Sequence, residues 1–135
     1  MSKIFSTFKV YSGLYDFAQD PAAGAVGTVN LGVVLPTFVR YYYFAVTERT
    51  NLTGGATTLA FGYIQQGSAA PTSVTNAFMT ATAIASFTSA PLRGVDLLAS
   101  PIQLLFPVAV TMTIAGAALT GGSLQFDLWT VSTEF

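Results

Sequence analysis

Six carboxylates are the candidate acids and bases of this chain. A hydrolase that works with paired carboxylates needs two of them within roughly 5–10 Å of each other, and no motif in the sequence brings two together. We therefore expect turn and surface roles for the carboxylates, and pairing across an interface for Glu48 with Arg49. The six are Asp16, Asp20, Glu48, Asp96, Asp127 and Glu134.

The chain contains no cysteine and no histidine. It therefore lacks thiolate nucleophiles, disulfides, the usual ligands of structural zinc and the usual general base at neutral pH. Two glycine-containing segments, Gly24–Gly27 and Gly54–Gly55, lack the Gly-x-x-x-x-Gly-Lys pattern of a phosphate-binding loop. We expect a protein that is not an enzyme and that holds no cofactor and no metal.

The composition indicates a surface that is covered by something other than water. Charged residues make up 8% of the chain and hydrophobic residues 52%, whereas ordinary soluble domains carry about 25% charged residues. Large exposed apolar patches usually mark interfaces. The five basic residues are scattered and the net charge is −1, so we expect no nucleic-acid partner.

Two adjacent segments in the first half of the chain are predicted to be strands. In Gly24–Pro36, apolar and small or polar residues alternate, which is the period of a strand that is covered on one face. The segment Thr37–Arg49 is almost continuously β-branched and aromatic, which suits a central strand that is buried on both faces. We expect these two segments to form a core pair.

Further strands are predicted along the rest of the chain. Alternation predicts strands over Thr57–Gln65, Val108–Ile114 and Leu124–Leu128, and the last two are expected to form an antiparallel hairpin. A short strand is expected over Ile102–Phe106. The segment Thr72–Ala90 leaves two possibilities open, a short helix over residues 74–83 or a strand over residues 80–88.

The domain organisation follows from these segments. Residues 1–23 are expected to form an N-terminal arm with a short strand near Thr7–Tyr11, which ends at an Asp20-Pro21 turn. Residues 24–135 are expected to form a single antiparallel β-sandwich, with a jelly roll the best match to seven or eight strands at this spacing. Neither a signal peptide nor a transmembrane helix is expected.

The chain resembles small bacteriophage virion proteins of the capsid-decoration, minor-capsid or head-fibre kind. The resemblance covers Gly24 to Val131 and lies in the types of residue that each strand contains and in the order of the strands. It implies a β-sandwich or jelly roll, usually oligomeric, that binds a capsid lattice or builds an appendage on it. The segments that carry it are Gly27–Pro36, Tyr43–Thr47, Ala56–Gly62, Val108–Ile114 and Leu119–Phe126.

These observations together predict a virion structural protein that works by assembly, with itself as a homo-oligomer, expected to be a trimer, and with other capsid proteins. The alternatives are a membrane-associated β-barrel and a carbohydrate- or receptor-binding module. Trp129 lies in step with Asp127 on the polar face of the last strand, so it is either capped by the arm or exposed for a partner. The residues expected to make subunit contacts are Phe5, Phe8, Tyr11, Trp129 and Phe135.

Overall fold

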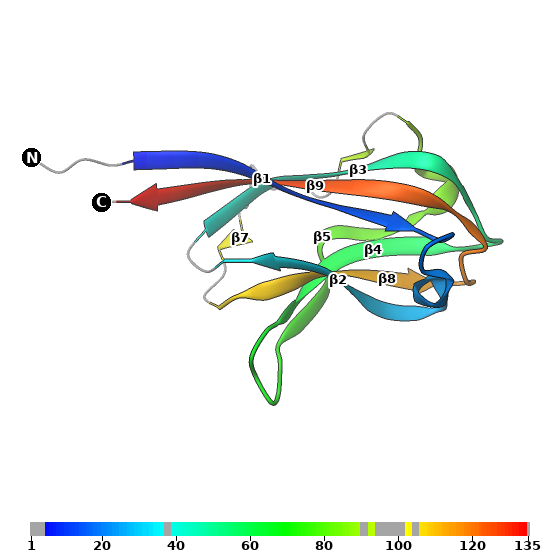
Figure 1. Cartoon of the computed structure of the whole chain (residues 1–135), viewed down its shortest axis with the longest axis horizontal. Coiled ribbons are helices and arrows are strands. Elements are labelled where there is room, and N and C mark those ends of the chain that lie inside the picture. The colour runs from blue at the N-terminus through cyan, green and yellow to red at the C-terminus, as the bar shows by residue number, and fades with distance from the viewer. Residues whose placement is uncertain (1–4, 37–38, 90–91, 94–101, 104–105, 135) are drawn as a thin grey trace, which may run out of the picture.

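The chain folds into two antiparallel β-sheets that pack face to face (Figure 1). The structure is a computed structural model and describes residues 5–36, 39–89, 92–93, 102–103 and 106–134. Within these residues there are nine strands and two single turns of 3₁₀-helix, η1 (Pro21–Gly24) and η2 (Ile84–Ser86). The strands are β1 (Phe5–Asp16), β2 (Gly27–Leu35), β3 (Val39–Thr53), β4 (Thr58–Gln65), β5 (Ser73–Ala83), β6 (Leu92–Arg93), β7 (Ile102–Gln103), β8 (Val108–Ala115) and β9 (Gly121–Glu134).

The strand pairing is nested. One sheet, which we call sheet A, has the order β1-β9-β3-β6, with β7 also paired to β3. The other, sheet B, has the order β2-β8-β4-β5. The first strand therefore pairs with the last, β2 with β8, β3 with β6 and β4 with β5. This order confirms the predicted β-sandwich and is compatible with a jelly roll, in which a long hairpin rolls up into two sheets.

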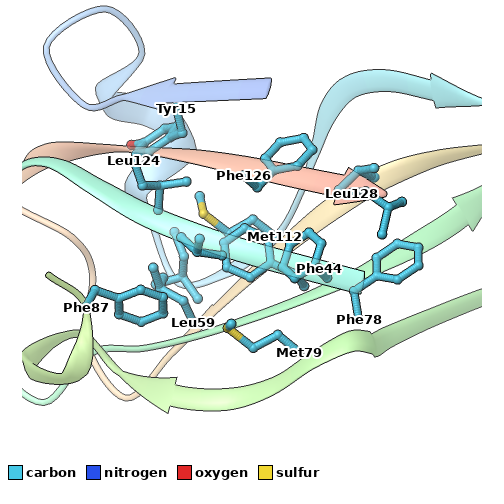
Figure 2. Packing of buried hydrophobic residues seen from close by; sticks show 14 of the residues in the cluster. Tyr15, Phe44, Leu59, Phe78, Met79, Phe87, Met112, Leu124, Phe126 and Leu128 are labelled. Carbon is cyan, nitrogen blue, oxygen red and sulfur yellow. The ribbon is translucent and has the colours of Figure 1, made fainter. Parts of the chain in front are cut away.

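The core lies between the sheets and is rich in aromatic side chains (Figure 2). The ring of Phe44 from β3 lies 5.3 Å from that of Phe61 in β4 and 6.0 Å from that of Phe126 in β9. Such ring pairs contribute about 0.5–1.5 kcal/mol each beyond the apolar area that they bury. The aromatic residues that the sequence places on strands therefore join the two sheets.

The predicted alternation is confirmed in several strands. In β2, Val29, Leu31 and Val33 are half-buried, and the residues between them are exposed. The alternating apolar residues that the sequence predicts as the inward faces of β4, β8 and β9 pack into the core, where most of them are fully buried. The buried members of these three strands are Leu59, Phe61, Val108, Val110, Met112, Ile114, Leu124, Phe126 and Leu128.

Two predicted pairings are wrong. The strands β2 and β3 do not form a core pair, because β2 is an edge strand of sheet B and β3 lies inside sheet A. Likewise, β8 and β9 do not form a hairpin, because the chain crosses from sheet B to sheet A between them. Backbone bonds fix this crossing: Leu119 N donates to Gly24 O and Thr120 N donates to Thr53 O, each at 2.8 Å.

Two further segments differ from expectation. The N-terminal strand is longer than predicted, because all of β1 pairs with β9 without a register shift. The possible helix over residues 74–83 is instead β5, which is rich in threonine and pairs with β4. Threonine favours strands because its branched side chain is restricted in a helix. The strand alternative over residues 80–88 is correct only for residues 80–83, because β5 runs from Ser73 to Ala83 and η2 follows it.

Other expectations are met or lie outside the described residues. Pro21 begins η1, and the Asp20 side chain accepts a hydrogen bond from Ala23 N at 3.3 Å, which confirms the turn. Residues 94–101 and Phe135 lie outside the described residues. Within the described ranges, no helix has the length and apolar character needed to cross a membrane.

Candidate interaction face

The carboxylates serve structural roles wherever the structure describes their side chains. Asp16 Oδ1 accepts from Ala18 N, and Glu48 Oε2 accepts from Leu52 N, both at 3.0 Å. Asp20 caps η1. No group of three or more metal-ligating side chains occurs among the residues that the structure describes. Five large hydrophobic side chains are exposed among the described residues, and three of them, Val10, Leu14 and Trp129, lie on sheet A.

The outer face of sheet A carries a row of polar side chains across three strands. Ser12 in β1 donates to Asp127 in β9, and Gln125 Nε2 donates to the same Asp127 Oδ1 at 3.1 Å. Arg49 in β3 donates to Gln125 Oε1 at 2.9 Å. Arg49 is thus held by Gln125 within the chain, and Glu48 caps a backbone N–H. Their expected pairing across an interface stays a prediction.

Apolar residues flank this polar row on both sides. On one side, Trp129 is 38% exposed and meets the ring of Tyr43 edge-on, with ring centres 4.7 Å apart. Val10 lies directly opposite Trp129 in the neighbouring strand and is 44% exposed. On the other side, Leu14 is 64% exposed. We call Val10, Ser12, Leu14, Tyr43, Asp127 and Trp129 the sheet A face.

Of the predicted contact residues, the structure places one on this face. Trp129 is flanked by Val10 of the N-terminal strand and is open to solvent, and its contact with a partner stays a prediction. Tyr11 points inward and packs against the core, with Lys9 Nζ 4.9 Å from its ring centre. Phe5 and Phe8 lie in β1, but the structure does not describe their side chains, and Phe135 lies outside the described residues.

Sequence reasoning missed Val10 and Leu14. The signal was present, because Val10, Ser12 and Leu14 alternate with Tyr11, Gly13 and Tyr15. Gly13 sits over the ring of Phe126, where an added Cβ would come within 2.4 Å of two ring atoms. From the sequence, Gly13 appears as a residue that interrupts a strand. In the structure it lies inside the continuous strand β1, where the absence of a side chain leaves room for the ring of Phe126.

A shallow pocket lies where β1 approaches β2 at the edge of the sandwich. It has a volume of about 250 Å³ and is lined by Leu14, Tyr15, Asp16, Asp20 and Leu31, among others. Tyr15 donates its hydroxyl to Asp20 O at 3.1 Å. Burial raises the pKa of Tyr15, and the nearby charges of Asp20 and Asp16 raise it further. The pocket therefore combines apolar walls with a negative potential.

Three solved structures with a similar fold are chains from phage capsids. One, in the acidic stable capsid structure of Helicobacter pylori bacteriophage KHP30, has a TM-score of 0.62 and 10% identity, with 98% of this chain and 99% of that chain covered. A chain of the cyanophage Pam1 capsid has a TM-score of 0.61 and 17% identity, with 94% and 86% covered. A chain of the Ralstonia phage GP4 capsid has a TM-score of 0.60 and 22% identity, with 95% and 84% covered.

At these identities the likeness shows the fold. No protein-family model matches the chain, and no curated protein sequence matches it. The resemblance to phage virion proteins drawn from the sequence is confirmed at the level of the fold.

Proposed function

We propose that the chain is a non-enzymatic structural protein of a phage virion, where it binds or builds the capsid lattice or an appendage on it. The observation that carries this proposal is the fold match with a capsid chain over 98% of this chain and 99% of the other. Such a match spans nearly the full length of both chains. A shared supersecondary motif would cover only part of each chain.

The surface chemistry supports the proposal. Only 8% of the residues are charged, and the sheet A face exposes Val10, Leu14 and Trp129 around a short polar row. Interfaces have this composition, since their centres are depleted in charge and enriched in aromatic residues, while hydrogen-bonded polar groups give orientation. We propose the sheet A face as a contact with another capsid protein or with a second copy of the chain.

The finer role is part of the same proposal. The proposal covers a decoration protein, a minor lattice protein and the base of an appendage, because a sandwich with an apolar contact face suits each of these roles. The trimer expected from the sequence stays a prediction, as do contacts through Phe5, Phe8, Tyr11 and Phe135. The fold neighbours favour neither alternative from the sequence, membrane association or carbohydrate and receptor binding.

The proposal is tested on virus particles. Particles of the virus that encodes the chain are purified on a density gradient, and the chain is quantified by mass spectrometry against the main lattice protein. We expect the chain to sediment with the particles at a fixed ratio to the lattice protein across preparations. A chain that is abundant in infected cells and missing from purified particles would contradict the proposal.

A further inference from the structure

One long edge of the sandwich is regular, and no strand covers it within the part of the chain that the structure describes. All twelve residues of β1 pair with β9 without a register shift, and no described strand pairs with the opposite side of β1. The other long edge strands, β2 and β5, both show register shifts against their partners. Irregular pairing and charged or proline residues are the usual devices that stop an edge from accepting another strand. Between Lys9 and Asp16, β1 contains no charge and no proline.

The exposed side chains of this edge are arranged symmetrically. Val10 and Leu14 lie two residues on either side of Ser12, on the outer side of the sheet. In an antiparallel pair of identical strands, a two-fold axis through Ser12 places Val10 of each copy opposite Leu14 of the other. An axis through Tyr11 would place Val10 opposite Ser12 and Leu14 opposite Phe8. An axis through Gly13 would place Val10 opposite Asp16 and Leu14 opposite Ser12, so neither axis pairs Val10 with Leu14. We propose that β1 pairs with β1 of a second copy about the axis through Ser12.

This register also brings opposite charges together. It places Lys9 of the second copy opposite Tyr15, and residues opposite each other across an antiparallel pair have their Cβ atoms about 4.5–5.5 Å apart. Tyr15 lines the pocket that also contains Asp16 and Asp20. Each copy therefore offers an exposed lysine to the acidic pocket of the other. Charge complementarity and apolar pairing select the same register.

The inference rests on the proposed function, in which the chain works by assembly, and it names a second copy as the partner of this edge. The paired strands would join two copies of sheet A into one continuous sheet and would bring Val10 of each copy beside Leu14 of the other. The contact is isologous, with the same patch used by both copies. It therefore predicts a dimer in solution in place of the trimer that the sequence analysis expects, because a trimer needs two different patches on each copy.

The test is the mass of the purified full chain, measured by analytical ultracentrifugation in detergent-free buffer over a concentration series. The double variant Val10→Lys with Leu14→Lys places like charges across both pairs, and we expect it to weaken the dimer at least about tenfold. The double variant Val10→Glu with Leu14→Lys places opposite charges across both pairs, and we expect it to restore the dimer. Because these positions are exposed in the single chain, the circular dichroism spectrum and Tm should stay unchanged.

Val26→Lys is the matched control for Leu14→Lys, because Val26 is 62% exposed and lies outside β1. We expect the dimer to survive Val26→Lys and to weaken with Leu14→Lys. A wild-type chain that stays monomeric or forms trimers would overturn the inference, as would a dimer that the double lysine variant leaves intact. Because the measurement uses no particles, its failure is distinguishable from failure of the proposed virion role.

Discussion

At the scale of single residues, the buried tyrosine of β3 links stability to pH. Tyr41 is fully buried, and its hydroxyl donates to Pro36 O at 3.0 Å. Burial raises the pKa of Tyr41 above its ordinary value of 10.0, and the nearby Tyr11 raises it further. The folded protein therefore keeps this proton at a pH where the unfolded chain has lost it. The contribution of the protonated Tyr41 hydroxyl to the free energy of unfolding is complete below pH 10. This contribution is lost as the pH rises further and approaches the raised pKa of the folded protein.

We therefore predict a characteristic pH profile for Tyr41→Phe. At neutral pH the variant should be less stable by about 0.5–1.5 kcal/mol, because one hydrogen bond is lost. Above pH 10 the wild-type chain should lose up to about 1.4 kcal/mol per pH unit through this group, and the variant should lose less. Urea unfolding at a series of pH values measures both curves. Parallel curves for the two proteins above pH 10 would contradict this account.

Replacing two buried threonines with valine is expected to change the free energy of unfolding in opposite directions. Thr111 Oγ1 is buried without a hydrogen-bond partner among the described residues, whereas Thr57 Oγ1 donates to Gly54 O and Ala118 O. We expect Thr111→Val to raise the free energy of unfolding by about 1 kcal/mol, because an unpaired hydroxyl is replaced by a methyl group. Thr57→Val should lower it by about 1–3 kcal/mol. Urea unfolding of both variants gives the comparison, and equal effects would contradict it.

At the scale of elements, the register shift between β4 and β5 depends on a glycine. Met79 pairs with Phe61 and Val74 with Tyr63, so β5 contains extra residues opposite Gly62. A Cβ on Gly62 would lie 1.8 Å from Val74 O, which belongs to the backbone and has no rotamer to change. We expect Gly62→Ala to destabilise the fold by about 3 kcal/mol or more.

Gly121→Ala is the control for this prediction. An added Cβ there would meet only the Thr53 hydroxyl, at 2.9 Å, and that side chain is exposed and able to turn. Thermal unfolding should show a large drop in Tm for Gly62→Ala and a small one for Gly121→Ala. Similar Tm values for both variants would show that β5 is not held against β4 as described.

We expect the sheet A face to be needed for incorporation of the chain into virus particles. Trp129 sits between Val10 and Tyr43, so its loss removes the largest exposed aromatic of the face. We expect Trp129→Ser to reduce incorporation at least about tenfold, because aromatic residues dominate the binding energy of interfaces. Val26→Ser, at an exposed apolar position outside the sheet, should leave incorporation unchanged. Equal incorporation of both variants, measured by mass spectrometry of purified particles, would count against the face.

At the scale of the whole molecule, alternation predicted the strands but not their partners. The apolar faces of β8 and β9 are clear in the sequence because large apolar residues alternate with small or polar ones. This pattern is the same whether two strands share a sheet or face each other across a core. The loop between β8 and β9 decides between these, through bonds from Leu119 and Thr120 to segments far away in the chain. Backbone hydrogen bonds between distant segments leave no pattern in the local sequence.

The candidate face was predictable only in part for a similar reason. Trp129 stands out because an indole interrupts the polar face of its strand. Leu14 does not, because β1 is stabilised by β9, more than a hundred residues later in the chain. When β9 is not known to pair with β1, Gly13 looks like the end of a short strand. The alternation on either side of Gly13 then does not show which side chains of β1 point outward.

The central claim is that the sheet A face of this sandwich is buried when the chain assembles into a virion. Cryo-electron microscopy of purified particles tests it most directly, because the sandwich can be fitted into the density of the capsid. We predict that the sandwich occupies symmetry-related positions, with protein density against Val10, Leu14 and Trp129. A reconstruction without the sandwich, or one in which this face is open to solvent, would contradict the account.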